Sequence, residues 1–143
     1  MENKVPDLKY YTNQLSKEGS ILFLTLINEA AMYGADCVKA VANVILNRAK
    51  ITGKDTAYEV IATPTRFPGF KKATMGSIIK LPKNCDEAIK TAFNCTLALI
   101  EKKQIPDRTN GSTLYGLHDY TFKKFKPEPE LVKKIGQLYF FRG

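Results

Sequence analysis

Ser20–Gly34 reads SILFLTLINEAAMYG. Apolar side chains cover almost every side of a helix built from these residues, which is typical of a helix at the centre of a fold. Gly34 is a natural helix stop, because glycine readily adopts the left-handed conformation that often ends a helix. The run therefore predicts a buried central helix from about Ser20 to just before Gly34, with one carboxylate, Glu29, near its end.

Two further helices are expected directly after the central one. Asp36 can cap a helix whose apolar residues recur at helical spacing until Gly53. Thr56 and Glu59 form a T-x-x-E capping box, which predicts a short helix that stops before Pro64.

The middle of the chain predicts a loop and then a long helix. Residues 65–83 hold two prolines and two glycines, and this composition favours an irregular loop. Asn84 with Glu87 can cap a helix that runs to about Lys103, since apolar residues recur along it at helical spacing.

The last third of the chain adds the β structure. A turn is expected at Asp107–Gly111 and a strand at Ser112–Leu117. Pro129 fits the first turn of a short helix that Gly136 ends, and Gln137–Arg142 favours a last strand. The predicted fold class is α+β, mainly α, with a small late β-hairpin or sheet.

Bulk composition fits one globular domain. The chain has 143 residues, 44% of them hydrophobic, so we expect a single domain over residues 1–143 with residues 1–19 as an N-terminal extension. No apolar run approaches the roughly 18–20 residues that span a bilayer, and residues 1–19 lack the apolar segment of a signal peptide. Three cysteines without a C-x-x-C pair, and no nucleotide or metal motif, predict neither a metal nor an organic cofactor.

The formal net charge of +8 indicates an affinity for anionic polymers. Nucleic acid is one such polymer, and the bacterial wall, with its carboxylates and teichoic phosphates, is another. A third interpretation is a solubilising surface on a lysine-rich chain. Charge by itself leaves these three open.

Glu29 is the residue best suited to chemistry. On the helix it lies close to Leu22 and beside Thr25 and Leu26. A carboxylate among apolar neighbours loses hydration, which raises its pKa and keeps it protonated, ready to donate a proton to a leaving oxygen. The structural alternative is a glutamate at a helix edge, solvated or paired with Arg48 or a lysine.

The sequence around Glu29 resembles the spore cortex-lytic enzymes, a family of cell-wall hydrolases. That family has a G-E-A-x-G-E segment followed by a helix reading roughly A-V-A-x-V-x-x-N-R, and this chain has Asn28–Ala30 and then Val38–Arg48 at a spacing that needs no gap. Later segments resemble the family in the same order: Tyr58–Ile61, Arg66-Phe67, Thr109–Tyr115 and Ile135–Phe141.

The resemblance implies a lysozyme-like domain that cleaves the β-1,4 bond between N-acetylmuramic acid and N-acetylglucosamine. Glu29 falls on the family's catalytic glutamate. Such enzymes are typically lytic transglycosylases, in which one glutamate protonates the glycosidic oxygen and then deprotonates the muramyl 6-hydroxyl. This differs from the two-carboxylate scheme of most glycosidases.

The chain departs from the family at three positions. Asn28 stands where the family has the glycine before the glutamate, Tyr33 falls on the motif's second glutamate, and Arg66 falls on the Q of its Q-F pair. We expect Asn28 to support the site, and Tyr33, Arg66 and Phe67 to contact substrate.

Four further residues have both a site and a plain structural interpretation. Asn47 and Arg48 are expected to support the site by bonding across to its loop, or to be ordinary polar residues at a helix end. Tyr115 is expected to bind a sugar, or to pack in the core. His118 is expected to touch substrate, or to be incidental at a strand end.

Three functions follow in order. The first is a peptidoglycan lytic transglycosylase whose partner is the glycan strand. The second is a weakened lysozyme-like structural or wall-binding component of a viral particle, with other virion proteins as partners. The third is a basic nucleic-acid-binding module, supported by the net charge and the Phe122–Lys126 stretch, without a specific binding motif. Since no signal peptide is seen, we expect a phage-encoded endolysin or virion protein, made in the cytoplasm and released by a holin or carried in the particle.

Overall fold

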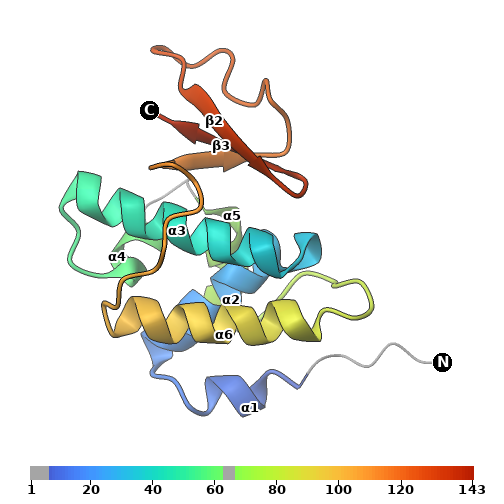
Figure 1. Ribbon diagram of the computed structural model, residues 1–143. Helices are drawn as coiled ribbons and strands as arrows, with labels where there is room; N and C mark the ends of the chain where they lie inside the picture. Colours follow the sequence, from blue (N-terminus) through green and yellow to red (C-terminus); the bar gives the residue numbers. More distant parts are fainter. Residues whose placement is uncertain (1–6, 63–66) are drawn as a thin grey trace.

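The computed structural model describes residues 7–62 and 67–143 (Figure 1). Helices α2, α3 and α6 cross one another in the body of the molecule, and a three-stranded antiparallel sheet lies beyond α3, opposite α1. The helices are α1 (Lys9–Thr12), α2 (Lys17–Ala30), the 3-10 turn η1 (Ala31–Tyr33), α3 (Ala35–Thr52), α4 (Ala57–Ile61), α5 (Pro68–Thr74) and α6 (Asp86–Ile100). The strands are β1 (Leu114–Gly116), β2 (Glu130–Ile135) and β3 (Leu138–Arg142).

Helix α2 is the predicted central helix. It begins at Lys17, because the Ser16 hydroxyl accepts a hydrogen bond from the Gly19 N–H at 3.1 Å, and so starts inside the predicted N-terminal extension. Phe23, Leu26 and Ile27 have no exposed surface. After Ala30 the helical segment continues as the 3-10 turn η1 and ends at Gly34, whose φ is +101°. The predicted end of this segment is confirmed.

Two predicted helix caps are wrong. Gly34, and not Asp36, holds the N-cap position of α3, and Asp36 lies exposed in the first turn. Cys85 holds the cap position of α6, because Asn84 has a φ of +65° that turns it out of the cap geometry. The capping box residue Thr56 does cap α4, accepting the Glu59 N–H at 3.1 Å, and Gly53 ends α3 at a φ of +69° as expected.

Residues 68–74, predicted as loop, form helix α5. Pro68 is the first residue of this helix, where the missing N–H would have had no partner and the fixed φ suits the helix. Proline at this position begins a helix, whereas the prediction treated it only as a breaker. The long helix α6 also ends three residues before Lys103, at Ile100.

The sheet has the order β1-β3-β2, with both pairs antiparallel. The helix predicted between Pro129 and Gly136 is therefore wrong: these residues form β2, which pairs with β3 from Glu130 opposite Arg142 to Ile135 opposite Leu138. Gly136, at a φ of +55°, makes the tight turn between the strands. The two other predicted strands, Ser112–Leu117 and Gln137–Arg142, are confirmed as β1 and β3 with shorter bounds.

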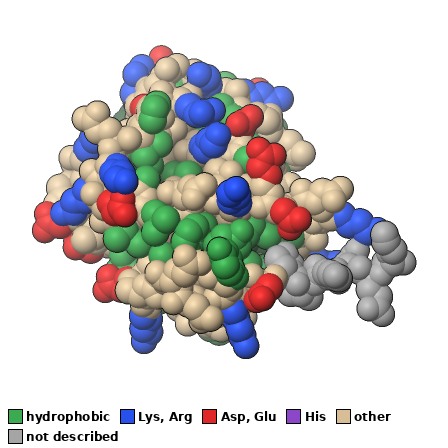
Figure 2. Space-filling view, turned by 60° about the horizontal axis from the view of Figure 1, so that its bottom comes forward, with side chains coloured by type: hydrophobic (Ala, Val, Ile, Leu, Met, Phe, Trp, Pro, Cys, Tyr) green, Lys and Arg blue, Asp and Glu red, His purple; other side chains and the backbone are tan. Residues whose placement is uncertain are grey.

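Helix α1 covers the core on the side away from the sheet. Tyr11 packs its ring against Phe23 of α2 and Phe93 of α6, with ring centroids 5.4 and 5.0 Å apart. Figure 2 shows apolar side chains gathered in the middle of this face between charged ones. None of the helices in the described residues is long and apolar enough to cross a membrane.

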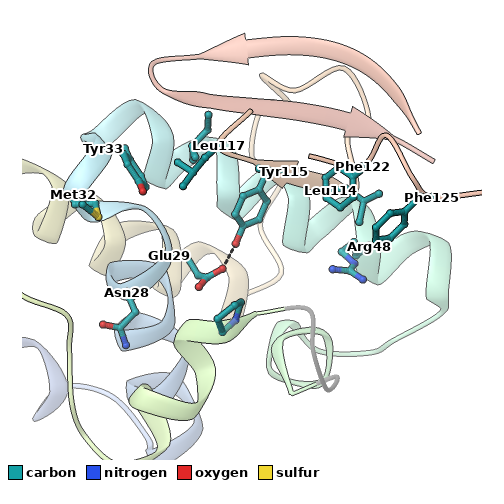
Figure 3. A pocket seen from close by; sticks show the side chains of 13 residues that line it. Asn28, Glu29, Met32, Tyr33, Arg48, Leu114, Tyr115, Leu117, Phe122 and Phe125 are labelled. Carbon is teal, nitrogen blue, oxygen red and sulfur yellow. Dashed lines mark hydrogen bonds between the residues drawn. The ribbon is translucent and has the colours of Figure 1, made fainter. Parts of the chain in front are cut away.

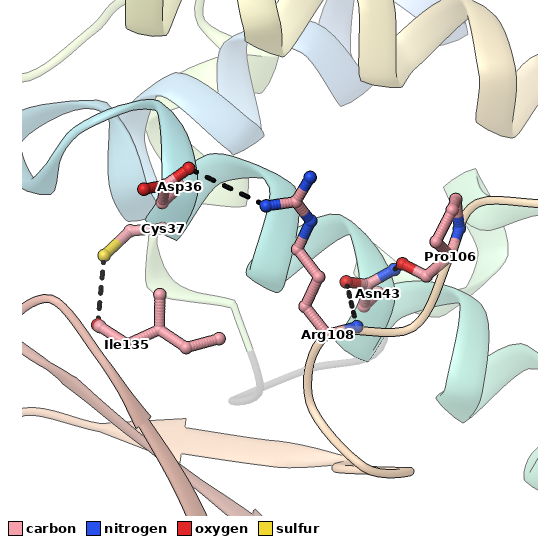
Figure 4. Close-up of polar contacts among 6 residues, drawn as sticks. All are labelled: Asp36, Cys37, Asn43, Pro106, Arg108 and Ile135. Atoms are coloured by element: carbon pink, nitrogen blue, oxygen red, sulfur yellow. Dashed lines mark hydrogen bonds and ion pairs between the residues drawn. The ribbon is translucent and has the colours of Figure 1, made fainter.

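Two asparagines of α3 hold the loop that leads into β1. Asn43, which is 1% exposed, donates to the Pro106 carbonyl at 3.0 Å and accepts the Arg108 N–H at 3.1 Å (Figure 4). One turn later, Asn47 donates to the Ser112 carbonyl at 3.0 Å and to Asp107 at 3.2 Å. These bonds fix where β1 lies against the helices.

Asn43→Ala is expected to lower the free energy of unfolding by about 1–3 kcal/mol, because it leaves the part-buried Pro106 carbonyl and Arg108 N–H without their partner. Asn94→Ala, the same change at an exposed position of α6, serves as the control and is expected to change stability by less than about 0.5 kcal/mol. Urea unfolding of both variants measures the difference. Equal losses in the two would contradict the assigned role of Asn43.

Candidate active site

Glu29 lies in the last turn of α2, where two other segments reach its carboxyl group. The Gly69 N–H, in the first turn of α5, donates to Oε2 at 2.8 Å. The Tyr115 hydroxyl, on β1, donates to Oε1 (Figure 3). Residues separated by 40 and 86 positions in the sequence thus meet on one side chain.

Gly69 must approach α2 this closely. A Cβ atom at this position would lie 2.6 Å from the Asn28 Cβ and 2.9 Å from the Glu29 Oε2. Any side chain here would therefore push α5 away from α2 and lengthen the bond from the Gly69 N–H to Glu29. Sequence reasoning placed Gly69 only in a loop, because nothing in the sequence shows which backbone it faces.

Asn28 holds the same segment from the adjacent position on α2. Its side chain donates to the Gly69 carbonyl at 3.1 Å and to the Ser77 carbonyl at 3.2 Å, and it accepts the Ile79 N–H at 2.8 Å. Asn28, which was predicted to support the site, thus binds the segment that carries the Gly69 N–H. Asn47, predicted for the same role, binds the loop before β1.

Burial dominates the electrostatics of Glu29. Loss of hydration raises its pKa above the ordinary value of 4.5, while the hydrogen bonds from Tyr115 and the Gly69 N–H act in the opposite direction. The pKa of Tyr115 is raised well above its ordinary range by burial first and then by the Glu29 charge. Tyr115 therefore remains a hydroxyl donor at all physiological pH values.

A cleft of about 690 Å³ opens beside this carboxyl group. The described residues that line it include the polar side chains of Glu29, Asn28 and Arg48, and Glu29 is the one carboxylate among them. Most of the remaining wall is apolar or aromatic: Met32, Tyr33, Leu117, Phe122, Phe125 and Leu138. A polar reacting centre with an apolar wall suits a ligand with both hydroxyl groups and apolar faces, such as a sugar chain.

Arg48 and Phe67 lie next to each other, close to Tyr115. The Arg48 guanidinium is 5.4 Å from the centroid of the Phe67 ring, and its positive charge lowers the pKa of Tyr115 against the larger effects that raise it. Phe67 is 4% exposed, and its ring centroid is 6.3 Å from that of Tyr115. The structure thus places Phe67 in support of Tyr115, and Arg48 on the cleft itself.

The three remaining predicted site residues differ in where they lie. Tyr33 lines the cleft one helical turn beyond Glu29. His118 lies just past the cleft in an exposed turn, where its ring stacks on Tyr120 with centroids 4.7 Å apart, and it is not among the lining residues. Arg66 lies outside the described residues.

Sequence reasoning missed much of the cleft wall. Phe122 and Phe125 were interpreted as part of a basic surface stretch, yet both face the cleft (Figure 3), while Lys123, Lys124 and Lys126 are exposed. The signal was the spacing of the two aromatics among lysines, but a segment without regular structure gives no period from which to infer a face. Within the described residues, no group of three His, Cys, Asp or Glu side chains could hold a metal ion.

Comparison with solved structures identifies the fold. The catalytic domain of the germination-specific lytic transglycosylase SleB from Bacillus anthracis aligns with a TM-score of 0.62 and 24% identity, over 96% of this chain and 100% of that domain. The catalytic domain of the Bacillus cereus SleB protein aligns with the same TM-score and identity, over 88% of this chain and 90% of that one. A scan against known protein families and a search of curated proteins give no match.

The chain therefore has the fold of the SleB catalytic domain. The expected class, an α+β fold that is mainly helical with a small late sheet, is confirmed by the elements and by these neighbours. The fold implied by the resemblance around Glu29 is confirmed with it.

Glu29→Gln is expected to stabilise the protein at neutral pH. Because the folded state raises the pKa of Glu29, folding stability falls as pH rises from the ordinary value of 4.5 through the folded value, and glutamine removes that loss. The melting temperature of the variant should exceed that of the wild type at pH 7, and the difference should shrink toward pH 4. Glu18→Gln, at an exposed position of the same helix, is the control, and a similar gain there would contradict the interpretation.

Proposed function

We propose that this chain cleaves the β-1,4 bond between N-acetylmuramic acid and N-acetylglucosamine in peptidoglycan, as a lytic transglycosylase with Glu29 as its acid and base. The observation that carries the proposal is the partly buried Glu29 carboxyl, which opens onto a cleft and is held by donors from α5 and β1. The sequence resemblance and the two SleB neighbours support it.

The first step uses the protonated acid. The Glu29 proton passes to the glycosidic oxygen, the bond from that oxygen to the muramyl C1 breaks, and N-acetylglucosamine leaves with a free hydroxyl. Burial favours the protonated form of Glu29 that this step requires. Positive charge then develops at C1, next to the carboxylate that has just formed.

The second step uses the same group as a base. The Glu29 carboxylate takes the proton of the muramyl 6-hydroxyl while that oxygen bonds to C1, which closes a 1,6-anhydro ring and restores the acid. Hydrogen bonds from Tyr115 and the Gly69 N–H stabilise the carboxylate between the steps. No water enters the product, which agrees with one carboxylate on the described cleft wall, where most glycosidases use two.

Product analysis tests this proposal. Purified protein, Glu29→Gln and the matched control Glu18→Gln are incubated with peptidoglycan, and the soluble products are weighed by mass spectrometry. We expect anhydromuropeptides from the wild type and the control, and a loss of at least about a thousandfold in Glu29→Gln.

Two results would contradict the proposal. Reducing-end products would show a hydrolase, and no product from the wild type would favour a lysozyme-like structural component that binds the wall without cutting it. A phage source and release by a holin stay predictions, and finding the chain in purified phage particles by mass spectrometry would test carriage in a virion.

Tyr115→Phe is expected to lower kcat by roughly tenfold to a hundredfold, since it removes one donor to the developing carboxylate but keeps the ring packing. With that bond gone the pKa of Glu29 rises, so the alkaline limb of the rate profile should move to higher pH. Tyr10→Phe, at an exposed tyrosine of α1, is the control. An unchanged kcat and pH profile in Tyr115→Phe would show that the hydroxyl plays no part in the reaction.

A further inference from the structure

Both side-chain N–H groups of Asn28 donate hydrogen bonds to one neighbouring segment. The side chain is 8% exposed, and both of its N–H bonds are used, one on the Gly69 carbonyl and one on the Ser77 carbonyl. Its oxygen accepts the Ile79 N–H at 2.8 Å. A single side chain thus ties residues 69 to 79 to the helix that carries Glu29.

The pair of bonds to Ser77 and Ile79 resembles the pairing of a β-strand. Ser77 offers its carbonyl and Ile79 its N–H on the same side of the chain, and the Asn28 amide takes the place of the neighbouring strand. The segment after α5 has no regular structure, so these bonds are its anchor on α2. The anchor also limits how far α5 can move.

Gly69 is held at both of its backbone groups by consecutive residues of α2. Asn28 binds its carbonyl at 3.1 Å, and Glu29 binds its N–H at 2.8 Å. The space that a Gly69 Cβ would need is already taken by Asn28 and Glu29. The position of the N–H that Glu29 accepts therefore depends on the bond that Asn28 makes.

We propose that Asn28 is a positioning residue for Glu29: by holding the Gly69 carbonyl, it keeps the Gly69 N–H against the carboxyl group and so sets the proton affinity of the catalytic acid. The catalytic part of this inference rests on the proposed function.

The groups around Glu29 come from four elements. Tyr115 on β1 donates to the carboxyl, Arg48 on α3 lines the same cleft, and Tyr33 in η1 lies one turn along. Helix α5 presents the Gly69 N–H. The three hydrogen bonds of Asn28 reach none of the side chains of Tyr115, Arg48 or Tyr33.

The test is an NMR titration of the Glu29 carboxyl carbon, assigned by its loss in Glu29→Gln, in the wild type, Asn28→Ala and Asn94→Ala. Asn94→Ala is the control, because it makes the same change at an exposed position of α6, away from the segments that reach Glu29. We expect the Glu29 midpoint to rise in Asn28→Ala, since the charged form loses a donor, and to stay unchanged in Asn94→Ala. An unchanged or lower midpoint in Asn28→Ala, or an equal rise in Asn94→Ala, would overturn the proposal.

Kinetics on peptidoglycan provide the second readout. Asn28→Ala should lower kcat by roughly tenfold to a hundredfold with little change in KM, because a misplaced acid affects the chemical step more than binding. The titration needs no turnover, so it decides the role of Asn28 even if the wild type cuts no peptidoglycan. A changed midpoint without wild-type activity would retain the positioning role and reject the proposed function.

If Asn28→Ala does not fold, the wild type itself gives the answer. The Gly69 amide and the Asn28 side-chain NH₂ signals are expected to titrate with the same midpoint as the Glu29 carboxyl. An Asn28 signal that stays flat through that midpoint would overturn the proposal.

Discussion

The hydrogen bonds to the Glu29 carboxyl are the constraint around which this site is arranged. A carboxyl group taken out of water needs donors, and here they come from the Gly69 N–H of α5 and the Tyr115 hydroxyl of β1. Since those donors belong to distant parts of the sequence, α5 and the sheet must both be placed correctly against α2. The apolar core around Phe23 and Leu26 holds α2 as the fixed reference.

Asparagine side chains hold the backbone next to α5 and β1 in place. Asn43 and Asn47 of α3 bind the backbone that leads into β1, and Asn28 of α2 binds the backbone on and after α5. In each case a short side chain with donors and an acceptor replaces regular secondary structure as the partner of an irregular segment. The irregular segments after α5 and before β1 are thereby fixed without becoming part of a sheet or a helix.

Several errors of sequence interpretation share one cause. Pro68 was predicted to lie in a loop, but it begins helix α5. Pro129 was predicted to begin a helix, but it precedes strand β2. Asp36 and Asn84 have the side chains of good caps, but Gly34 and Cys85 occupy the cap positions because of where the backbone turns. Local composition identifies the residues that can start or end a helix or strand, and long-range packing decides which conformation each of them adopts.

The sequence by itself determined the central helix, since apolar residues cover almost every side of Ser20–Gly34, and it marked Glu29 as the carboxylate near the end of this helix. It also indicated two of the three late strands, β1 and β3, and it named Asn28 and Asn47 as candidates for support of the site. Only the tertiary structure decided what Glu29 touches and which side chains wall the cleft. Gly69, Phe122 and Phe125 have no local pattern that points to Glu29, because hydrogen bonds and clefts form between segments whose approach is set by the packing of the whole chain.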